Sequence, residues 1–165
     1  MNLVIVESPA KAKTINKYLG DQYTVLASYG HIRDLPSKNG SVDPKDKFKM
    51  IWEVDSFSKK YLKEITDVAK KSTKIILATD PDREGEAIAW HVKEYLDEKK
   101  VLKDKKIERV VFNEITKKAV TNGIENPRNI ESNLVDAYMA RRALDYLVGF
   151  NICLLYTSDA ADDDH

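Results

Sequence analysis

An acidic turn between a buried strand and an amphipathic helix constrains this chain more than any other segment. Residues 74–78 form a short apolar run rich in β-branched side chains, which is typical of a buried strand. From 87 to 96, apolar side chains recur at helical spacing. The connection between them carries four carboxylates, at Asp80, Asp82, Glu84 and Glu86. Like charges this close repel one another unless a cation offsets them, and Mg²⁺ is the natural one because it prefers oxygen ligands and shares itself with phosphate. The alternative is an acidic turn that is simply solvated.

Strands and helices alternate along the rest of the chain. Strands are predicted at 3–6, 23–27, 74–78 and 107–112, with a short edge strand at 50–54. Helices are predicted at 9–19, 58–71, 87–96, 114–122 and 132–147. This alternation favours an α/β fold in which a parallel sheet of about four strands carries helices on both faces.

Two strand ends bring acidic side chains together in such a fold. In open parallel sheets, sites form beyond the carboxyl ends of the strands. Glu7 follows the first strand, and Asp80 follows the strand at 74–78. If these strands are neighbours, Glu7, Asp80 and Asp82 converge on one metal ion.

The first helix begins with a cap and two lysines. Ser8 is suited to cap this helix and Pro9 to its first position. Lys11 and Lys13 lie in its first two turns, where the helix dipole disfavours cations. A bound anion would remove that penalty, whereas the plainer alternative is that both lysines point into water.

Two histidines receive different interpretations. His91 falls within the apolar stripe of the helix at 87–96, so we expect it to face the core. His31 lies in a predicted structured loop at 28–36, where a histidine more often forms a hydrogen bond than acts as a catalyst.

Composition narrows the class of protein. The 165 residues are one-third charged and contain no apolar stretch long enough to cross a bilayer or to form a signal peptide, so a cytoplasmic protein is expected. One cysteine excludes an internal disulfide and a Cys-rich zinc site. The net charge is zero, but four of the 27 acidic side chains lie in 153–165, so residues 1–152 hold 23 acidic against 27 basic side chains. A polyanionic partner is therefore allowed but not required.

Four segments carry a more specific pattern: VESPAKAKT at 6–14, GHIRDLP at 30–36, DPDREGEAIAWH at 80–91 and FNEIT at 112–116. In order and spacing they resemble the N-terminal Toprim domain of the bacterial DNA topoisomerase I family. The resemblance covers residues 1–152 nearly end to end. A glutamate after the first strand and a D-x-D turn are shared with primases and recombination proteins, whereas the ESPAKAK form is similar to topoisomerase I in particular.

The resemblance implies a Toprim fold and a type IA mechanism, in which negatively supercoiled DNA is relaxed without ATP. A tyrosine attacks one strand, forms a 5′-phosphotyrosine link, another strand passes, and the break is resealed. By resemblance, Glu7, Asp80 and Asp82 hold Mg²⁺, and Glu84 completes the acidic cluster. Lys11 is assigned to the charge that develops on the phosphate, so the catalytic set is Glu7, Lys11 and Glu84.

The resemblance also implies contacts with DNA. Lys11, His31 and Arg33 are similar to residues that face DNA in the family. Residues 136–150 resemble the helix that enters the DNA-binding domain, where Arg141 and Arg142 are expected to contact the backbone of single-stranded DNA.

That helix also departs from the family. An ion pair between Arg141 and Asp145 on one helix face is the alternative to a DNA contact by Arg141. Tyr138 and Met139 stand where glutamines are usual. Tyr146 stands where arginine is frequent and is assigned to stacking on a base.

Three parts are expected along the chain: a Toprim domain at 1–128, the truncated first helix of the DNA-binding domain at 129–152, and a non-native tail at 153–165. The family continues differently after residue 152, and the tail shows neither repeat nor periodicity. A natural acidic tail is the alternative. The tail therefore receives no functional role.

The family's nucleophilic tyrosine belongs to a later domain, so this chain is expected to be inactive alone. The parent enzyme is expected to be a monomer. The competing functions are a stand-alone Toprim module that binds Mg²⁺ and single-stranded nucleic acid, and a Toprim nuclease.

Overall fold

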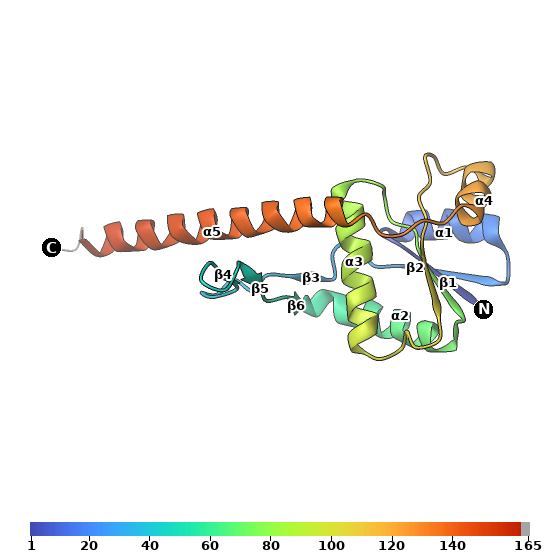
Figure 1. The fold of residues 1–165 in the computed structure, drawn as a ribbon, viewed down its shortest axis with the longest axis horizontal. Helices are drawn as coiled ribbons and strands as arrows, with labels where there is room; N and C mark the ends of the chain where they lie inside the picture. Colours follow the sequence, from blue (N-terminus) through green and yellow to red (C-terminus); the bar gives the residue numbers. More distant parts are fainter. Residues whose placement is uncertain (163–165) are drawn as a thin grey trace.

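A computed structural model describes the backbone of residues 1–162, with the side chains of residues 1–152 and Leu155. Its centre is a four-stranded parallel sheet in the order β2-β1-β7-β8. The strands are β1 (Asn2–Val6), β2 (Tyr23–Ala27), β7 (Lys74–Leu77) and β8 (Lys106–Arg109). The helices are α1 (Pro9–Leu19), α2 (Lys59–Lys71), α3 (Arg83–Glu98), α4 (Lys117–Glu125) and α5 (Ser132–Asp162) (Figure 1). The predicted α/β class and strand number are confirmed.

Helices cover both faces of the sheet because successive strand residues point to opposite sides. Leu3 and Ile5 of β1 pack in one core cluster with residues of α2 and α3, such as Leu62. Val4 and Val6 pack in a second cluster with residues of α1 and α4. All four of these β1 side chains are fully buried, which explains why the strand reads as a continuous apolar run.

Element ends follow local caps. Ser8 accepts a hydrogen bond from the Lys11 N–H at 3.2 Å and caps α1, as predicted. The fourth helix begins at Lys117, later than expected, because Thr116 caps it by accepting from the Ala119 N–H at 3.2 Å. The strand predicted at 107–112 ends at Arg109, whose backbone pairs with Arg128 in an isolated antiparallel bridge.

Residues 33–54 form an arm of four two-residue strands beside the main sheet. β3 (Arg33–Asp34) pairs with β6 (Glu53–Val54), and β4 (Val42–Asp43) pairs with β5 (Lys49–Met50). The predicted single edge strand at 50–54 is therefore wrong, since its two ends belong to different two-stranded sheets. Between those ends, Trp52 turns inward and packs edge-on against His91 of α3.

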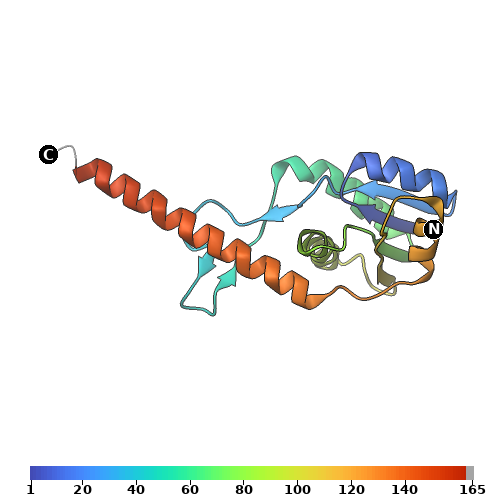
Figure 2. The same cartoon turned by 90° about the horizontal axis from the view of Figure 1, so that it is seen from above.

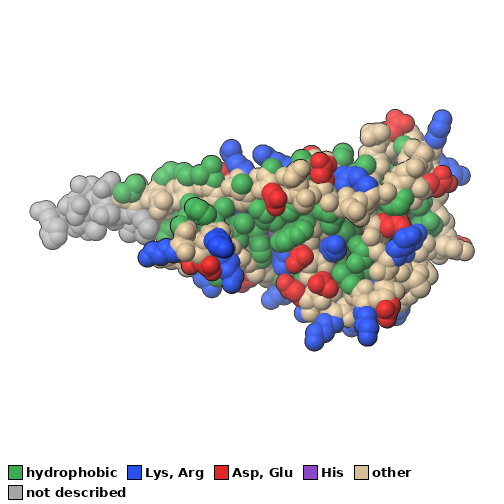
Figure 3. All heavy atoms as spheres, in the orientation of Figure 1, with side chains coloured by type: hydrophobic (Ala, Val, Ile, Leu, Met, Phe, Trp, Pro, Cys, Tyr) green, Lys and Arg blue, Asp and Glu red, His purple; other side chains and the backbone are tan. Residues whose placement is uncertain are grey.

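The last helix leaves the body as one long rod (Figures 1 and 2). Its inner face buries Val135, Met139, Ala143 and Tyr146. Its outer face exposes the hydrophobic side chains of Leu144, Val148, Ile152 and Leu155. Hydrophobic side chains, in green, are visible along α5 in Figure 3. The helix runs beyond the predicted end at 147 because no proline interrupts it before Asp162. Residues 163–165 of the expected tail lie outside the described residues.

Across residues 1–162, none of the helices combines the length and the apolar character that crossing a bilayer demands.

Candidate functional site

The loops after three parallel strands meet in one small cavity. β1 and β7 are neighbours, as the predicted convergence of their ends requires. The cavity has a volume of about 240 Å³. It is lined by residues of the loops after β1, β2 and β7, at Glu7, Gly30, His31, Asp80 and Asp82, and by residues of the first two turns of α3, at Glu84, Gly85 and Ile88. Every acidic residue assigned to the metal from sequence lines it.

Lys11 lies between two of these carboxylates. Its Nζ donates to Glu7 Oε1 at 2.7 Å and to Asp80 Oδ1 at 2.9 Å, with 12% of the side chain exposed. The hydrogen bond from Lys11 is the main reason that the pKa of Asp80 is lowered. Lys13 is exposed, so the interpretation of lysines that point into water fits Lys13 and not Lys11. The other carboxylate oxygen of Glu7, Oε2, is buried and has no hydrogen-bond partner among the described residues.

A tight turn holds Asp80 and Asp82 in place. Asp82 Oδ1 accepts from the Gly85 N–H at 2.7 Å and caps α3, while Thr79 Oγ1 donates to the Gly85 carbonyl at 2.6 Å. A Cβ at Gly85 would stand 1.9 Å from the Asp80 carbonyl oxygen. Only glycine allows this close approach, a role that sequence reasoning did not assign.

Glu86, the fourth carboxylate of the turn, does not join the cavity. Its side chain is fully buried, and Oε1 accepts from Arg109 Nε at 3.1 Å and from Arg128 Nη2. The Glu131 N–H donates to Glu86 Oε2 at 3.1 Å. Burial opposes ionisation of Glu86, but the hydrogen bonds from Arg128, Arg109 and this N–H outweigh it, so the pKa of Glu86 is lowered.

Arg109 also donates hydrogen bonds to the backbone of the acidic turn. Its guanidinium is buried and donates to the carbonyls of Leu77, Thr79, Asp80 and Val110, the shortest of these bonds being 2.6 Å. Sequence reasoning missed both Arg109 and the burial of Glu86. Helical spacing could have indicated the burial of Glu86, because Glu86 lies on the same face of α3 as the buried residues Ala89, Val92 and Leu96.

His31 and Arg33, assigned together to DNA, are placed differently. His31 lines the cavity and stacks on Tyr138, with centroids 5.0 Å apart, and burial lowers its pKa. The Arg33 side chain turns into the protein, donating from Nε to His91 Nδ1 at 3.0 Å, and lies 5.4 Å from the Trp90 ring centroid. The structure therefore brings His31 to the site but leaves Arg33 outside it.

The two arginines of α5 are paired with acids. Arg142 reaches across to Asp34 with two hydrogen bonds, of 2.7 and 3.1 Å. Arg141 donates to Asp145 at 3.3 Å along the exposed helix face, the pair foreseen as the alternative to DNA contact.

Tyr146 is covered by the arm. Its ring is only 9% exposed, its hydroxyl donates to the Lys38 carbonyl and accepts from the Ser41 N–H at 3.4 Å, and it stacks with Phe150. In this arrangement the Tyr146 ring presents no free face to a base.

His91 is buried within α3, as predicted, and burial, followed by the nearby Arg33, lowers its pKa to about 3.

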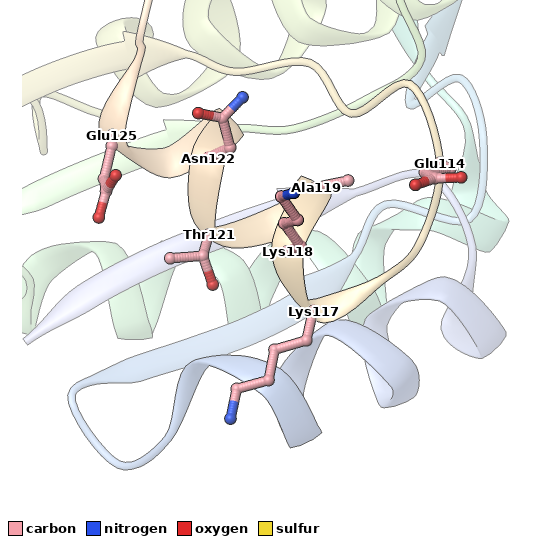
Figure 4. A pocket seen from close by; sticks show the side chains of 7 residues that line it. All are labelled: Glu114, Lys117, Lys118, Ala119, Thr121, Asn122 and Glu125. Carbon is pink, nitrogen blue, oxygen red and sulfur yellow. The ribbon is translucent and has the colours of Figure 1, made fainter.

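Other features of the described residues are weaker candidates for the functional site than this cavity. Among the described residues, no three metal-binding side chains already stand close enough to enclose an ion. A larger hollow, of about 870 Å³, runs along the surface of α4, and its side chains point in different directions rather than toward a common centre (Figure 4).

Comparison with known proteins gives a consistent picture. The model of the Toprim domain matches residues 2–115. The chain is 61% identical over 153 residues to DNA topoisomerase 1 of Rickettsia bellii, covering 92% of this chain and 19% of the relative. It is also 61% identical over 152 residues to DNA topoisomerase 1 of Zymomonas mobilis, covering 92% of this chain and 12% of that relative. The solved full-length topoisomerase I of Thermotoga maritima superimposes with a TM-score of 0.78 at 43% identity, over 88% of this chain and 24% of that one. The chain thus spans a fifth or less of these curated relatives.

Proposed function

The chain belongs to the Toprim domain family, and on that premise we propose that it forms the metal-binding part of a type IA DNA topoisomerase, an ATP-independent isomerase. The observation that carries the proposal is the meeting of Glu7, Lys11 and Asp80 at the carboxyl ends of two neighbouring strands. A cationic group held between acidic ones suits a site that must balance the charges of a phosphodiester and a divalent cation.

The donor set fits Mg²⁺. Mg²⁺ binds proteins through one or two carboxylates together with waters and substrate phosphates. Glu7 offers its buried, unpartnered Oε2, and Asp80, Asp82 and Glu84 line the same cavity. We assign these four residues to the metal. When bound, Mg²⁺ would supply positive charge to the scissile phosphate and orient the 3′-hydroxyl that reseals the break.

Lys11 supplies a fixed positive charge next to that phosphate. Its ammonium is held by Glu7 and Asp80 at hydrogen-bond distance, so little reorganisation is needed before it donates to a phosphate oxygen. Glu7 thereby has two roles, as a metal ligand and as the group that positions Lys11. Glu84 lines the same cavity and adds to its negative charge.

The proposed substrate is negatively supercoiled DNA that presents a single strand to this edge of the sheet. His31 would contact it at the cavity, and Arg141 and Arg142 would contact its backbone from α5. Arg33 and Tyr146 could take part only after leaving their present partners. The tyrosine that forms the 5′-phosphotyrosine link is expected in a later domain of the relatives. The whole enzyme is proposed to be a monomer that acts in the cytoplasm.

A domain exchange tests the proposal. Residues 1–152 would replace the matching segment of the Thermotoga maritima enzyme, and relaxation of a negatively supercoiled plasmid with Mg²⁺ would be measured. We expect the chimera to relax the plasmid and Asp80→Asn to abolish relaxation. Asp104→Asn is the matched control, because Asp104 is an exposed turn residue with φ 61° and asparagine tolerates that conformation.

Three results would count against the proposal. A folded but inactive chimera would contradict the assignment to a topoisomerase. Plasmid nicking by the 165-residue chain alone, lost in Asp80→Asn, would favour the nuclease. Single-strand binding by the chain without activity of the chimera would favour a stand-alone binding module.

A further inference from the structure

An aromatic cluster on the surface has no part in the function proposed above. The rings of Tyr29 and Tyr61 stack with centroids 3.7 Å apart and planes 20° apart, and Phe57 meets Tyr61 edge-on at 5.7 Å. Phe57 is 66% exposed and Tyr29 is 40% exposed. We call these three residues the aromatic platform. Aromatic side chains gathered on a surface at this exposure point to a contact with another molecule.

Two backbone segments hold the residues of the platform in position. Tyr29 has φ 59°, a left-handed conformation that is unfavourable for a bulky side chain, and it turns the ring outward at the end of β2. Phe57 lies in a short 3-10 helix, Ser56–Ser58, whose cap Asp55 accepts from the Phe57 N–H at 3.0 Å. Tyr61 follows in the first turn of α2. The rings are therefore held in position before any partner arrives.

The platform adjoins the acidic cavity along the chain. Gly30, the residue after Tyr29, lines the cavity, and its N–H donates to the Glu7 carbonyl at 3.0 Å. Because consecutive Cα atoms are about 3.8 Å apart, the Cα of Tyr29 lies within a few ångströms of a residue that lines the cavity.

The charges that flank the platform suit a polyanion. The first two turns of α2 expose Lys59, Lys60 and Lys63 against one acid, Glu64. Glu53, Asp55 and Asp67 lie just outside these two turns. Single-stranded nucleic acid is recognised by this combination, since a cationic surface follows the backbone and aromatic rings stack on bases of any sequence. A duplex has its bases stacked inside and offers no such faces.

We propose that Tyr29, Tyr61 and Phe57 form a base-stacking subsite for single-stranded nucleic acid, next to the acidic cavity. The subsite holds a base of the same strand whose phosphate lies in the cavity. This placement of the strand rests on the proposed function. Stacking on the platform itself does not depend on strand cleavage, so the two can be tested apart.

The test measures binding of the 165-residue chain to a fluorescein-labelled oligothymidylate by anisotropy. Tyr29→Ala and Phe57→Ala should each weaken binding about fivefold or more, the range found for loss of one base–aromatic stack. Tyr29→Phe keeps the ring and should bind as the parent does. Phe48→Ala is the matched control, because Phe48 is also exposed, at 54%, and also has a positive φ, of 57°, but lies in the arm. It should change binding less than about twofold.

The salt dependence separates stacking from electrostatics. The slope of log Kd against log salt reports the phosphates neutralised, so Tyr29→Ala should keep the parent's slope while Lys60→Ala lowers it. Light scattering on the same samples tests whether the platform instead joins two copies of the chain.

Several outcomes would overturn the inference. These are undiminished binding by both alanine variants, equal losses in Tyr29→Phe and Tyr29→Ala, an equal loss in Phe48→Ala, no binding by the parent, or self-association that Phe57→Ala abolishes. Failure of the chimera with a retained platform effect would instead overturn the topoisomerase assignment alone.

Discussion

Gly85→Ala should disable the acidic turn, because the turn has no room for a Cβ. The added atom would lie 1.9 Å from the Asp80 carbonyl oxygen, 2.6 Å from its carbon and 2.9 Å from its Cα. Ordinary contact distance starts near 3.4 Å, so α3 and the turn would have to separate by about 1.5 Å. All three clashing atoms belong to the backbone, which cannot rotate out of the way.

The magnitude follows from what that separation breaks. Arg109 Nη2 donates to the Asp80 carbonyl at 2.6 Å, and moving this carbonyl away from the buried guanidinium removes a charge-assisted hydrogen bond, a loss of about 1.5–3 kcal/mol. Overpacking adds about 1–3 kcal/mol, and the higher helix propensity of alanine returns at most about 1 kcal/mol. We expect the free energy of unfolding to fall by about 1.5–6 kcal/mol and the Mg²⁺ affinity to fall with it.

Urea unfolding followed by circular dichroism measures the first effect, and isothermal titration with Mg²⁺ measures the second. Gly149→Ala is the matched control, because Gly149 also lies in a helix but has nothing within 4 Å of its Cβ position. It should raise the free energy of unfolding by about 0.5–1 kcal/mol.

The reasoning would be refuted if Gly85→Ala were as stable as the parent and bound Mg²⁺ equally well. Equal destabilisation by Gly149→Ala would also refute it, since the effect would then come from glycine replacement in general.

Three further predictions concern buried groups and caps. Glu86→Gln should lower the free energy of unfolding by about 3–5 kcal/mol, because Arg109 stays buried without its counter-charge; a loss under about 1 kcal/mol in urea unfolding would contradict this. Thr116→Ala should cost about 1 kcal/mol through loss of the α4 cap, and thermal unfolding should register it as a lower Tm. The pKa of His91 falls from 6.5 in the unfolded chain to about 3 in the folded protein. The stability that depends on a neutral His91 is therefore fully present above pH 6.5 and is lost as the pH falls. At pH 5 the free energy of unfolding should be lower by about 2 kcal/mol for this reason. Unfolding curves of His91→Gln should lack that part of the pH dependence, and identical curves for parent and variant would exclude it.

The sequence predicted the sheet and the convergence of its ends because both depend on strong local signals. The run at 3–6 is apolar without a break, and a parallel order places Glu7 and Asp80 at one edge whatever the details of the loops. The bridging position of Lys11 did not follow, because helix spacing leaves its long side chain free to point either way.

The arm and the partners of the buried ionic groups were beyond sequence reasoning for a physical reason. Arg33 and Glu86 carry charges that are normally exposed. Only tertiary partners make their burial favourable, namely His91 and Glu98 for Arg33 and Arg109 for Glu86. The two-residue strands of the arm are too short for any periodicity, and their pairing is set by packing beneath α5. Tyr146 was assigned to DNA by position in a family pattern, whereas the arm that covers it is distant in sequence.

The central claim is that the carboxylates around Lys11 hold a divalent cation, and a crystal grown with Mn²⁺ in place of Mg²⁺ tests it most directly. We expect an anomalous difference peak in the cavity within coordination distance of Glu7 and Asp80, with the Lys11 ammonium still held by Glu7 Oε1. A cavity without a peak and with Lys11 still bridging both carboxylates, or a peak only along α4, would contradict the claim.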